Sequence, residues 1–171
     1  MDSTTRDITP HDTAPLDALF EARSIAVVGA SENVTRMGGG LTMRFLIDHG
    51  YQGDLYPVNP KRDEVQGVAC HASLESIPGP IDLAVLAVPA AAIPGVLEAI
   101  PEGHVRTGLV LTSGFGELNE EGGDIERRLL EAARARGVRF VGPNSVGVAN
   151  LWGNVVNSFS QVFDATDLTP G

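Results

Sequence analysis

The stretch Ser24-Ile25-Ala26-Val27-Val28, followed by Gly29, decides the fold class of this chain. Its apolar residues follow one another without a break, whereas a strand with one face in water alternates apolar and polar residues. A continuous apolar run of this length is typical of a strand that is covered on both faces. We therefore expect residues 24–28 to form a central strand of a parallel sheet.

The rest of the chain alternates between short β-branched runs and longer segments with helical spacing, which is the pattern of stacked β-α-β units. Further strands are expected at residues 54–58, 81–88, 108–112 and 138–141, and helices at residues 41–50, 90–100 and 120–136. The sequence thus predicts a doubly wound α/β fold. Its mainly parallel sheet should contain five or more strands, with helices on both faces.

The two ends of the chain differ from this pattern. Residues 1–15 are polar and are interpreted as a flexible leader, so the fold should begin near Leu16. Residues 150–169 nearly alternate polar and apolar side chains. This predicts an irregular or hairpin ending that packs on the sheet, with Trp152 as a packing residue.

Composition limits the classes of partner. The 171 residues include 12 Lys and Arg against 22 Asp and Glu, which gives a formal net charge of −10. Duplex DNA and anionic membranes need a dense basic face, so neither is expected as the main partner. The single cysteine, Cys70, has no nearby Cys or paired His that would suggest a metal site. No run approaches the roughly 20 apolar residues of a spanning helix. A soluble, cytoplasmic protein is expected.

Small residues that can form hydrogen bonds follow each predicted strand, where a parallel sheet has its ligand crevice. The glycines of residues 29–40 would let the backbone approach a phosphate closely, although this loop matches neither G-x-G-x-x-G nor a Walker motif. The loops at residues 88–90, 111–116 and 142–147 follow the later strands. We expect these loops to form one site at the rim of the sheet.

The second predicted strand is followed by Asn59-Pro60-Lys61-Arg62. A nicotinamide dinucleotide site usually has an acidic residue at this place, to hold the ribose hydroxyls. Two cations suit instead an additional phosphate on a nucleotide ribose, which both coenzyme A and NADP carry. A solvated surface turn is the other interpretation. The four histidines are interpreted as structural or surface residues, and Ser31, Ser113 and Ser145 have no identifiable base beside them, so no catalytic residue is assigned.

Five motifs in order carry a resemblance to a known family: residues 24–31 (SIAVVGAS), 56–61 (YPVNPK), 82–90 (DLAVLAVPA), 113–117 (SGFGE) and 142–147 (GPNSVG). Over residues 16–150 the chain resembles the CoA-binding domain of NDP-forming acyl-CoA synthetases. These enzymes are relatives of ADP-forming acetyl-CoA synthetase and of the succinyl-CoA synthetase alpha subunit. The resemblance implies a Rossmann-like domain, with residues 151–171 as an extension that leads towards a second domain.

The resemblance also implies which residues bind CoA. The loop from Ser31 to Gly39 would wrap the phosphates, Lys61 helped by Arg62 would meet the ribose 3′-phosphate, and Asn144 would lie near the pantetheine or the acyl site. The full implied set is Gly29, Ser31, Arg36, Met37, Gly38, Gly39, Asn59, Pro60, Lys61, Arg62, Val88, Pro89, Leu111, Thr112, Ser113 and Asn144. The family often has cysteine where Ser145 stands, so that position receives no role.

In this family the reaction passes from an acyl phosphate and a phosphorylated histidine to acyl-CoA. It uses a phosphohistidine domain and an ATP-grasp domain, and neither is recognised in these residues. The resemblance therefore implies a chain that binds CoA for thioester formation but does not turn over alone. Two alternatives remain at this point: an NADP-binding domain of an oxidoreductase or redox sensor, and a regulatory or interaction domain without catalysis. A homo-oligomer is also left open.

Overall fold

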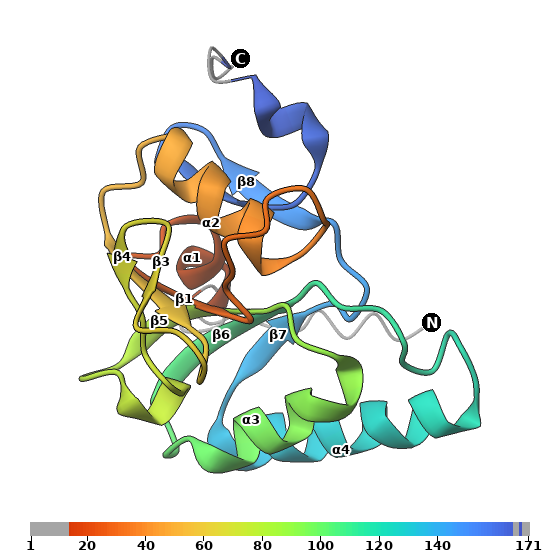
Figure 1. Cartoon of the computed structure of the whole chain (residues 1–171). Coiled ribbons are helices and arrows are strands. Elements are labelled where there is room, and N and C mark those ends of the chain that lie inside the picture. Colours follow the sequence, from red (N-terminus) through yellow and green to blue (C-terminus); the bar gives the residue numbers. More distant parts are fainter. Residues whose placement is uncertain (1–13, 166–167, 169–171) are drawn as a thin grey trace, which may run out of the picture.

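The computed structural model describes residues 14–165 and residue 168, and its centre is a parallel sheet between two layers of helices (Figure 1). The sheet has five strands in the order β2-β1-β5-β6-β7. The predicted doubly wound α/β fold is confirmed. None of the helices in this part of the chain has the length and apolar character that crossing a bilayer would require.

The elements have the following bounds. The strands are β1 (Ser24–Val28), β2 (Asp54–Val58), β3 (Glu64–Val65), β4 (Val68–Ala69), β5 (Ile81–Leu86), β6 (Val105–Val110), β7 (Arg139–Val141), β8 (Gly147–Asn150) and β9 (Val155–Ser158). The helices are α1 (Ala14–Phe20), α2 (Gly39–Asp48), α3 (Ile93–Ala99) and α4 (Glu120–Arg136), with the short 3-10 helices η2 (Leu74–Ser76), η3 (Ala90–Ala92) and η4 (Gln161–Asp164).

Strand β1 buries both of its faces, as its sequence predicts. Ala26 and Val28 belong to the core beneath α3 and α4, whereas Ile25 and Val27 belong to the core beneath α1 and α2. Figure 1 shows the two pairs of helices on opposite sides of the sheet. Because both faces are covered, a polar side chain within these strands would be buried without water, which explains the continuous apolar run.

The order of the strands fixes where a ligand can bind. From β1 the chain crosses to β2 on one side, and it then returns to the other side of β1 to form β5. The loops that follow β1 and β5 therefore lead away from the sheet in different directions. In open parallel sheets, the crevice at such a point, beyond the carboxyl ends of the strands, is the usual ligand site.

Several boundaries differ from the sequence predictions. Strand β5 ends at Leu86 and not at residue 88, and β6 spans Val105–Val110 and not residues 108–112. The earlier start of β6 is explained by pairing, since Val105 lies opposite Ile81 and Thr107 lies opposite Leu83. The first described element is α1, which starts at Ala14, so the last two residues of the predicted leader are helical. Residues 1–13 lie outside the described part.

The carboxyl-terminal segment forms a hairpin, which is one of the two predicted alternatives. The hairpin starts before residue 150, the predicted boundary. Strands β8 and β9 pair antiparallel from Gly147↔Ser158 to Asn150↔Val155. The hairpin packs mainly against α2, where Val156 joins Leu41 and Phe45. The expectation for Trp152 was wrong: this side chain lies in the turn between β8 and β9 and is 76% exposed.

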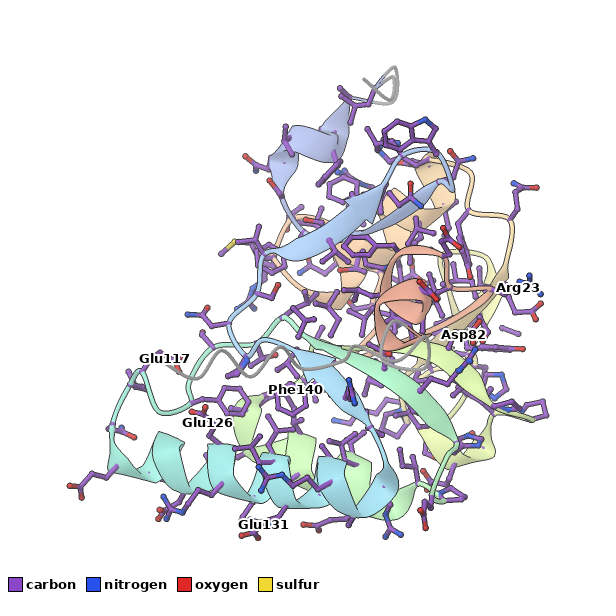
Figure 2. The ribbon with its side chains drawn as sticks, turned by 180° about the vertical axis from the view of Figure 1, so that it is seen from behind. Arg23, Asp82, Glu117, Glu126, Glu131 and Phe140 are labelled. Carbon is purple, nitrogen blue, oxygen red and sulfur yellow. The ribbon has the colours of Figure 1, made fainter. Side chains whose placement is uncertain are left out.

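A charged network ties the amino-terminal ends of the strands together. Asp82 accepts hydrogen bonds from the Arg23 amide and from the Arg106 guanidinium, both at 2.9 Å. Figure 2 shows Arg23 and Asp82 at the end of the sheet opposite to Glu117. Burial is the largest influence on the Asp82 carboxyl and raises its pKa, but the bonds from Arg106 and Arg23 together hold the pKa below its usual value of 3.8.

Replacing Asp82 tests this network. A carboxyl whose folded pKa is lowered contributes stability above its unfolded pKa, and that contribution is lost as the pH falls through the folded pKa. We expect Asp82→Asn to lower the free energy of unfolding by about 1–2 kcal/mol at neutral pH. Urea unfolding should show this difference shrinking as the pH falls below the usual carboxyl pKa of 3.8. Glu131→Gln, on the exposed face of α4, is the control and should change neither the free energy of unfolding nor its dependence on pH.

Candidate functional site

The loop after β1 is packed against the first turn of α2 without room for a side chain. A Cβ on Gly39 would lie 2.3 Å from the carbonyl oxygen of Gly29, and a Cβ on Gly40 would lie 2.0 Å from that of Asn33. Gly29 itself has a φ of +88° and lies against the carbonyl of Ala87. These glycines bring the ends of β1 and β5 and the start of α2 into direct backbone contact.

The first turn of α2 offers free backbone donors beside this contact. Gly38 is the N-cap residue and supplies no side-chain cap, because it has none. The first amides of an α-helix have no partner within the helix, and the helix dipole adds a partial positive charge there. An anion next to Gly38 and Gly39 would be stabilised by both effects.

The turn after β2 is held by the side chain of Asn59. Its amide nitrogen donates to the Ala30 carbonyl at 2.9 Å, and its amide oxygen accepts from the backbone N–H of Lys61 at 3.0 Å. Lys61 and Arg62 are exposed, and the Lys61 side chain forms no ion pair within the described part of the chain. Asn59 therefore fixes the turn that carries a free ammonium group.

A large cavity, of about 700 Å³, opens at the carboxyl ends of β1, β2 and β5. Its walls come from the ends of these strands, from η2 and from one side of α3. The lining residues are Val28, Gly29, Val58, Asn59, Pro60, Lys61, Ala72, Ser73, Leu74, Glu75, Val88, Pro89, Ala92, Gly95, Val96 and Ala99. Most of these contribute apolar atoms, and Lys61 and Glu75 are the charged members of the lining. The large cavity suits a flat apolar group with a charged substituent at its rim.

A small cavity, of about 300 Å³, lies beside the start of α2 and the ends of β5 and β6. Its lining residues are Met37, Gly38, Ala87, Leu111, Thr112, Ser113, Asn144 and Phe159. The Thr112 hydroxyl donates to the Val88 carbonyl at 2.7 Å, and the backbone N–H of Asn144 donates to the Thr112 carbonyl at 2.9 Å. These bonds join the loops after β5, β6 and β7, which supply part of the lining of the small cavity.

The loop at residues 113–117 has its amides occupied by the protein's own carboxylates. Glu117 accepts from the amides of Gly114 at 2.7 Å and Phe115 at 3.1 Å, and Glu126 accepts from Gly116 at 3.1 Å. These backbone bonds, above all the bond from Gly114, lower the pKa of Glu117. Figure 2 shows the Glu117 and Glu126 side chains near the amino-terminal end of α4. The loop thus offers Ser113 to a ligand but not its following amides.

The structure brings the residues predicted for binding to one edge of the sheet. Six of them line the large cavity: Gly29, Asn59, Pro60, Lys61, Val88 and Pro89. Six others line the small cavity: Met37, Gly38, Leu111, Thr112, Ser113 and Asn144. Ser31, Arg36, Gly39 and Arg62 line neither cavity, although Gly39 packs directly under the loop of Gly29.

Sequence reasoning missed several residues that build this site. The walls from η2 and α3, with Leu74, Gly95 and Val96, were not predicted, nor was Phe159 from the final hairpin. Gln66 was also missed, although its side chain reaches back to the loop after β1. One signal was available for it, since Gln66-Gly67 stands between two short β-forming pairs, as in a tight hairpin.

Comparisons with known proteins agree with this geometry. A family model described as a CoA binding domain matches residues 23–150. The alpha subunit of ADP-forming acetate–CoA ligase I from Pyrococcus furiosus is 39% identical over 160 residues, which cover 91% of this chain and 34% of that subunit. ADP-forming acetate–CoA ligase II from Archaeoglobus fulgidus is 37% identical over 142 residues, covering 83% of this chain and 21% of that protein.

Among solved structures, a dinucleotide forming acetyl-coenzyme A synthetase 1 from Ca. Korarchaeum cryptofilum, in complex with phosphate and ADP, superimposes with a TM-score of 0.81. It is 32% identical to this chain, and the match covers 91% of this chain and 32% of the synthetase chain. The present chain therefore spans about a third or less of the length of these relatives.

Fold and site together define a Rossmann-like domain with a ligand crevice at the carboxyl ends of its strands. Within that class, the chain belongs to the family of CoA-binding domains and is related to ADP-forming acyl-CoA synthetases. The resemblance carried by the five sequence motifs is thereby confirmed, and coenzyme A is the cofactor that this membership supports.

The contact between Gly39 and Gly29 can be tested by one methyl group. We expect Gly39→Ala to lower the free energy of unfolding by about 2–3 kcal/mol, because the methyl group would overlap a backbone carbonyl that cannot rotate away. Gly123→Ala in α4 is the matched control, since only the end of the Arg127 side chain lies within 4 Å of its Cβ. The control should gain about 0.5–1 kcal/mol. Equal losses in both variants would contradict the close contact.

Proposed function

We propose that this chain binds coenzyme A across the two cavities and holds it for thioester formation in an acyl-CoA synthetase of the NDP-forming type. The observation that carries the proposal is the pair of cavities at the Gly29–Gly39 contact, the large one lined by Gly29 and the exposed Lys61 and the small one lined by Gly38. A nucleotide with a long flexible arm fits this arrangement better than a compact ligand.

The large cavity is assigned to the adenosine part of CoA. Its apolar walls from Leu74, Val88 and Val96 would cover the faces of the adenine ring. Burial of a flat aromatic group between such walls removes apolar surface from water on both sides. The ribose would then face the turn after β2.

Lys61 is assigned to the ribose 3′-phosphate. It lines the large cavity, forms no ion pair with any residue whose position the structure describes, and is a cation in a chain with a net charge of −10. A charge-assisted bond between an ammonium and a phosphate is stronger than one between neutral groups. Arg62 follows on the same turn and would add to the local positive potential.

The diphosphate is assigned to the backbone at Gly38 and Gly39, between the two cavities. The unpaired amides at the start of α2 would serve as donors there. The pantetheine arm would continue into the small cavity, past Thr112 and Ser113 and towards Asn144. In this path the reactive thiol leaves the domain on the side of the loops after β6 and β7.

The chemistry of the full reaction belongs to parts beyond this chain. We propose a phosphohistidine domain and an ATP-grasp domain as its partners in the parent synthetase. The chain by itself is then expected to bind CoA and to form no acyl-CoA from acetate and ATP. The shares of 34% and 21% that it covers in its relatives leave room for such domains in those proteins.

The test of this function compares ligands that differ by one phosphate. Titration calorimetry should show CoA binding to the wild-type protein at least about tenfold more tightly than dephospho-CoA, because the latter lacks the group assigned to Lys61. Lys61→Gln should bring the affinity for CoA down to that for dephospho-CoA. Arg62→Gln is the neighbouring control, and its affinity for CoA should fall less than that of Lys61→Gln.

Two results would overturn these assignments. Equal affinities of Lys61→Gln and wild type for CoA would remove Lys61 from the 3′-phosphate site. Tighter binding of NADPH than of CoA would favour the alternative of an NADP-binding domain, because NADP also carries a ribose phosphate.

The large cavity has its own test at Gly95. A Cβ at this position meets nothing within 4 Å, and the residue lies on the side of α3 that lines the cavity. Gly95→Leu should therefore fill part of the adenine site and weaken CoA and dephospho-CoA alike by about tenfold or more. Folding should be unharmed, because leucine favours a helix over glycine by roughly 0.5–1 kcal/mol. Unchanged affinity, with Gly123→Leu as control, would place adenine elsewhere.

A further inference from the structure

Gln66 stands at the tip of the β3–β4 hairpin in a backbone conformation that glutamine rarely adopts. Its φ is +51°, and the φ of the following Gly67 is +81°. A two-residue hairpin turn with both central residues at positive φ favours Asn-Gly, Asp-Gly or Gly-Gly. Glutamine at the first of these positions therefore has a local conformational cost, and such a cost points to a role for the side chain.

The side chain and amide of Gln66 form three hydrogen bonds to the loop after β1 and to the start of α2. Its Nε2 donates to the carbonyls of Ser31 and Gly40, both at 2.9 Å. Its backbone N–H donates to the Glu32 carboxylate at 2.8 Å. One residue thus joins both ends of residues 31–40, the segment that faces the phosphates in the proposed function.

Apart from the packing of the Asn33 carbonyl on Gly40 and of Val34 on Leu41 and Phe45, few contacts in the described part of the chain order this segment. Residues 31–38 have no helix or strand, and Glu32, Asn33, Thr35, Arg36 and Met37 are exposed. The hydrogen bonds within the segment are local, such as those from Thr35 to the Asn33 side chain. When a loop becomes ordered only on binding, the entropy cost of ordering it reduces the net free energy of binding. A loop that is already ordered therefore binds the ligand more tightly.

The hairpin itself does not depend on these bonds. Val65 is fully buried in the core shared with β1 and α2, and the Cys70 amide donates to the Asp63 carbonyl at 2.8 Å. The Gln66 side chain therefore contributes little to holding the hairpin in place. Its bonds act on the loop.

We propose that Gln66 is a positioning residue that holds the loop after β1 ready for the phosphates of coenzyme A. The inference rests on the proposed function for the identity of the ligand, but the clamp on the loop exists without it. Gln66 acts through the loop backbone and touches no ligand atom itself.

The decisive variant is Gln66→Asn, in which asparagine suits the turn but is one methylene too short to reach both carbonyls. The melting temperature should stay equal or rise, because the turn conformation is relieved. Affinities for CoA and dephospho-CoA should both fall by about tenfold, so that their ratio stays as in wild type. In ligand-free protein, amide hydrogen exchange of residues 31–40 should become faster.

Gln52→Asn is the matched control. Gln52 also donates its side-chain amide to a turn carbonyl, that of Gly50 at 2.8 Å, but it precedes β2 at the opposite end of the sheet. This variant should change neither affinity nor the exchange of residues 31–40.

Each other outcome decides against a stated claim. Wild-type affinity in Gln66→Asn overturns the positioning role, and unchanged exchange in residues 31–40 overturns the clamp. A fall in melting temperature together with a loss of affinity assigns Gln66 to general stability instead. A wild-type protein that binds no CoA overturns the proposed function, and the exchange measurement then still decides whether the clamp exists.

Discussion

The close approach of two backbones, the loop after β1 and the first turn of α2, is the constraint on which the site depends. No side chain fits between the Gly29 carbonyl and Gly39, or between the Asn33 carbonyl and Gly40. Because the Gly29 loop also touches the Ala87 carbonyl, the ends of β1 and β5 and the start of α2 meet at one place. Gly29 lines the large cavity and Gly38, the neighbour of Gly39, lines the small one, so this contact joins residues of both cavities.

Electrostatics then narrows where an anion can bind along this edge. The chain carries a net charge of −10, and the amides of Gly114, Phe115 and Gly116 are already bonded to carboxylates. Among the described residues, the first amides of α2 and the cationic side chains of Arg36, Lys61 and Arg62 have no carboxylate partner. The binding edge therefore has a small number of donors at fixed places in an otherwise repulsive field, which favours selectivity for phosphate position over general attraction of anions.

Residues whose burial follows directly from the sequence pattern were predicted well. The bounds of β1 and β2 match, and α4 ends at Gly137 as expected, with a φ of +70°. The start of β6 was missed because Arg106 interrupts the apolar run. Arg106 is tolerated in the strand because its guanidinium pairs with Asp82 at the amino-terminal end of the sheet. The cavity walls from η2 and α3 depend on tertiary packing, which leaves no periodic signal in the sequence.

The polar side chains at the edge of the sheet mostly form hydrogen bonds to the protein's own backbone. Both ends of the Asn59 amide bond to backbone, and the Thr112 hydroxyl bonds to the Val88 carbonyl. Such side chains look like ligand contacts in a sequence, because loops that bind and loops that are tied together use the same residue types. In the proposed function, recognition of the ligand then falls on the backbone at Gly38 and Gly39 and on Lys61, helped by Arg62. A site of this kind is sensitive to loop geometry, since a backbone amide cannot change rotamer to follow a displaced phosphate.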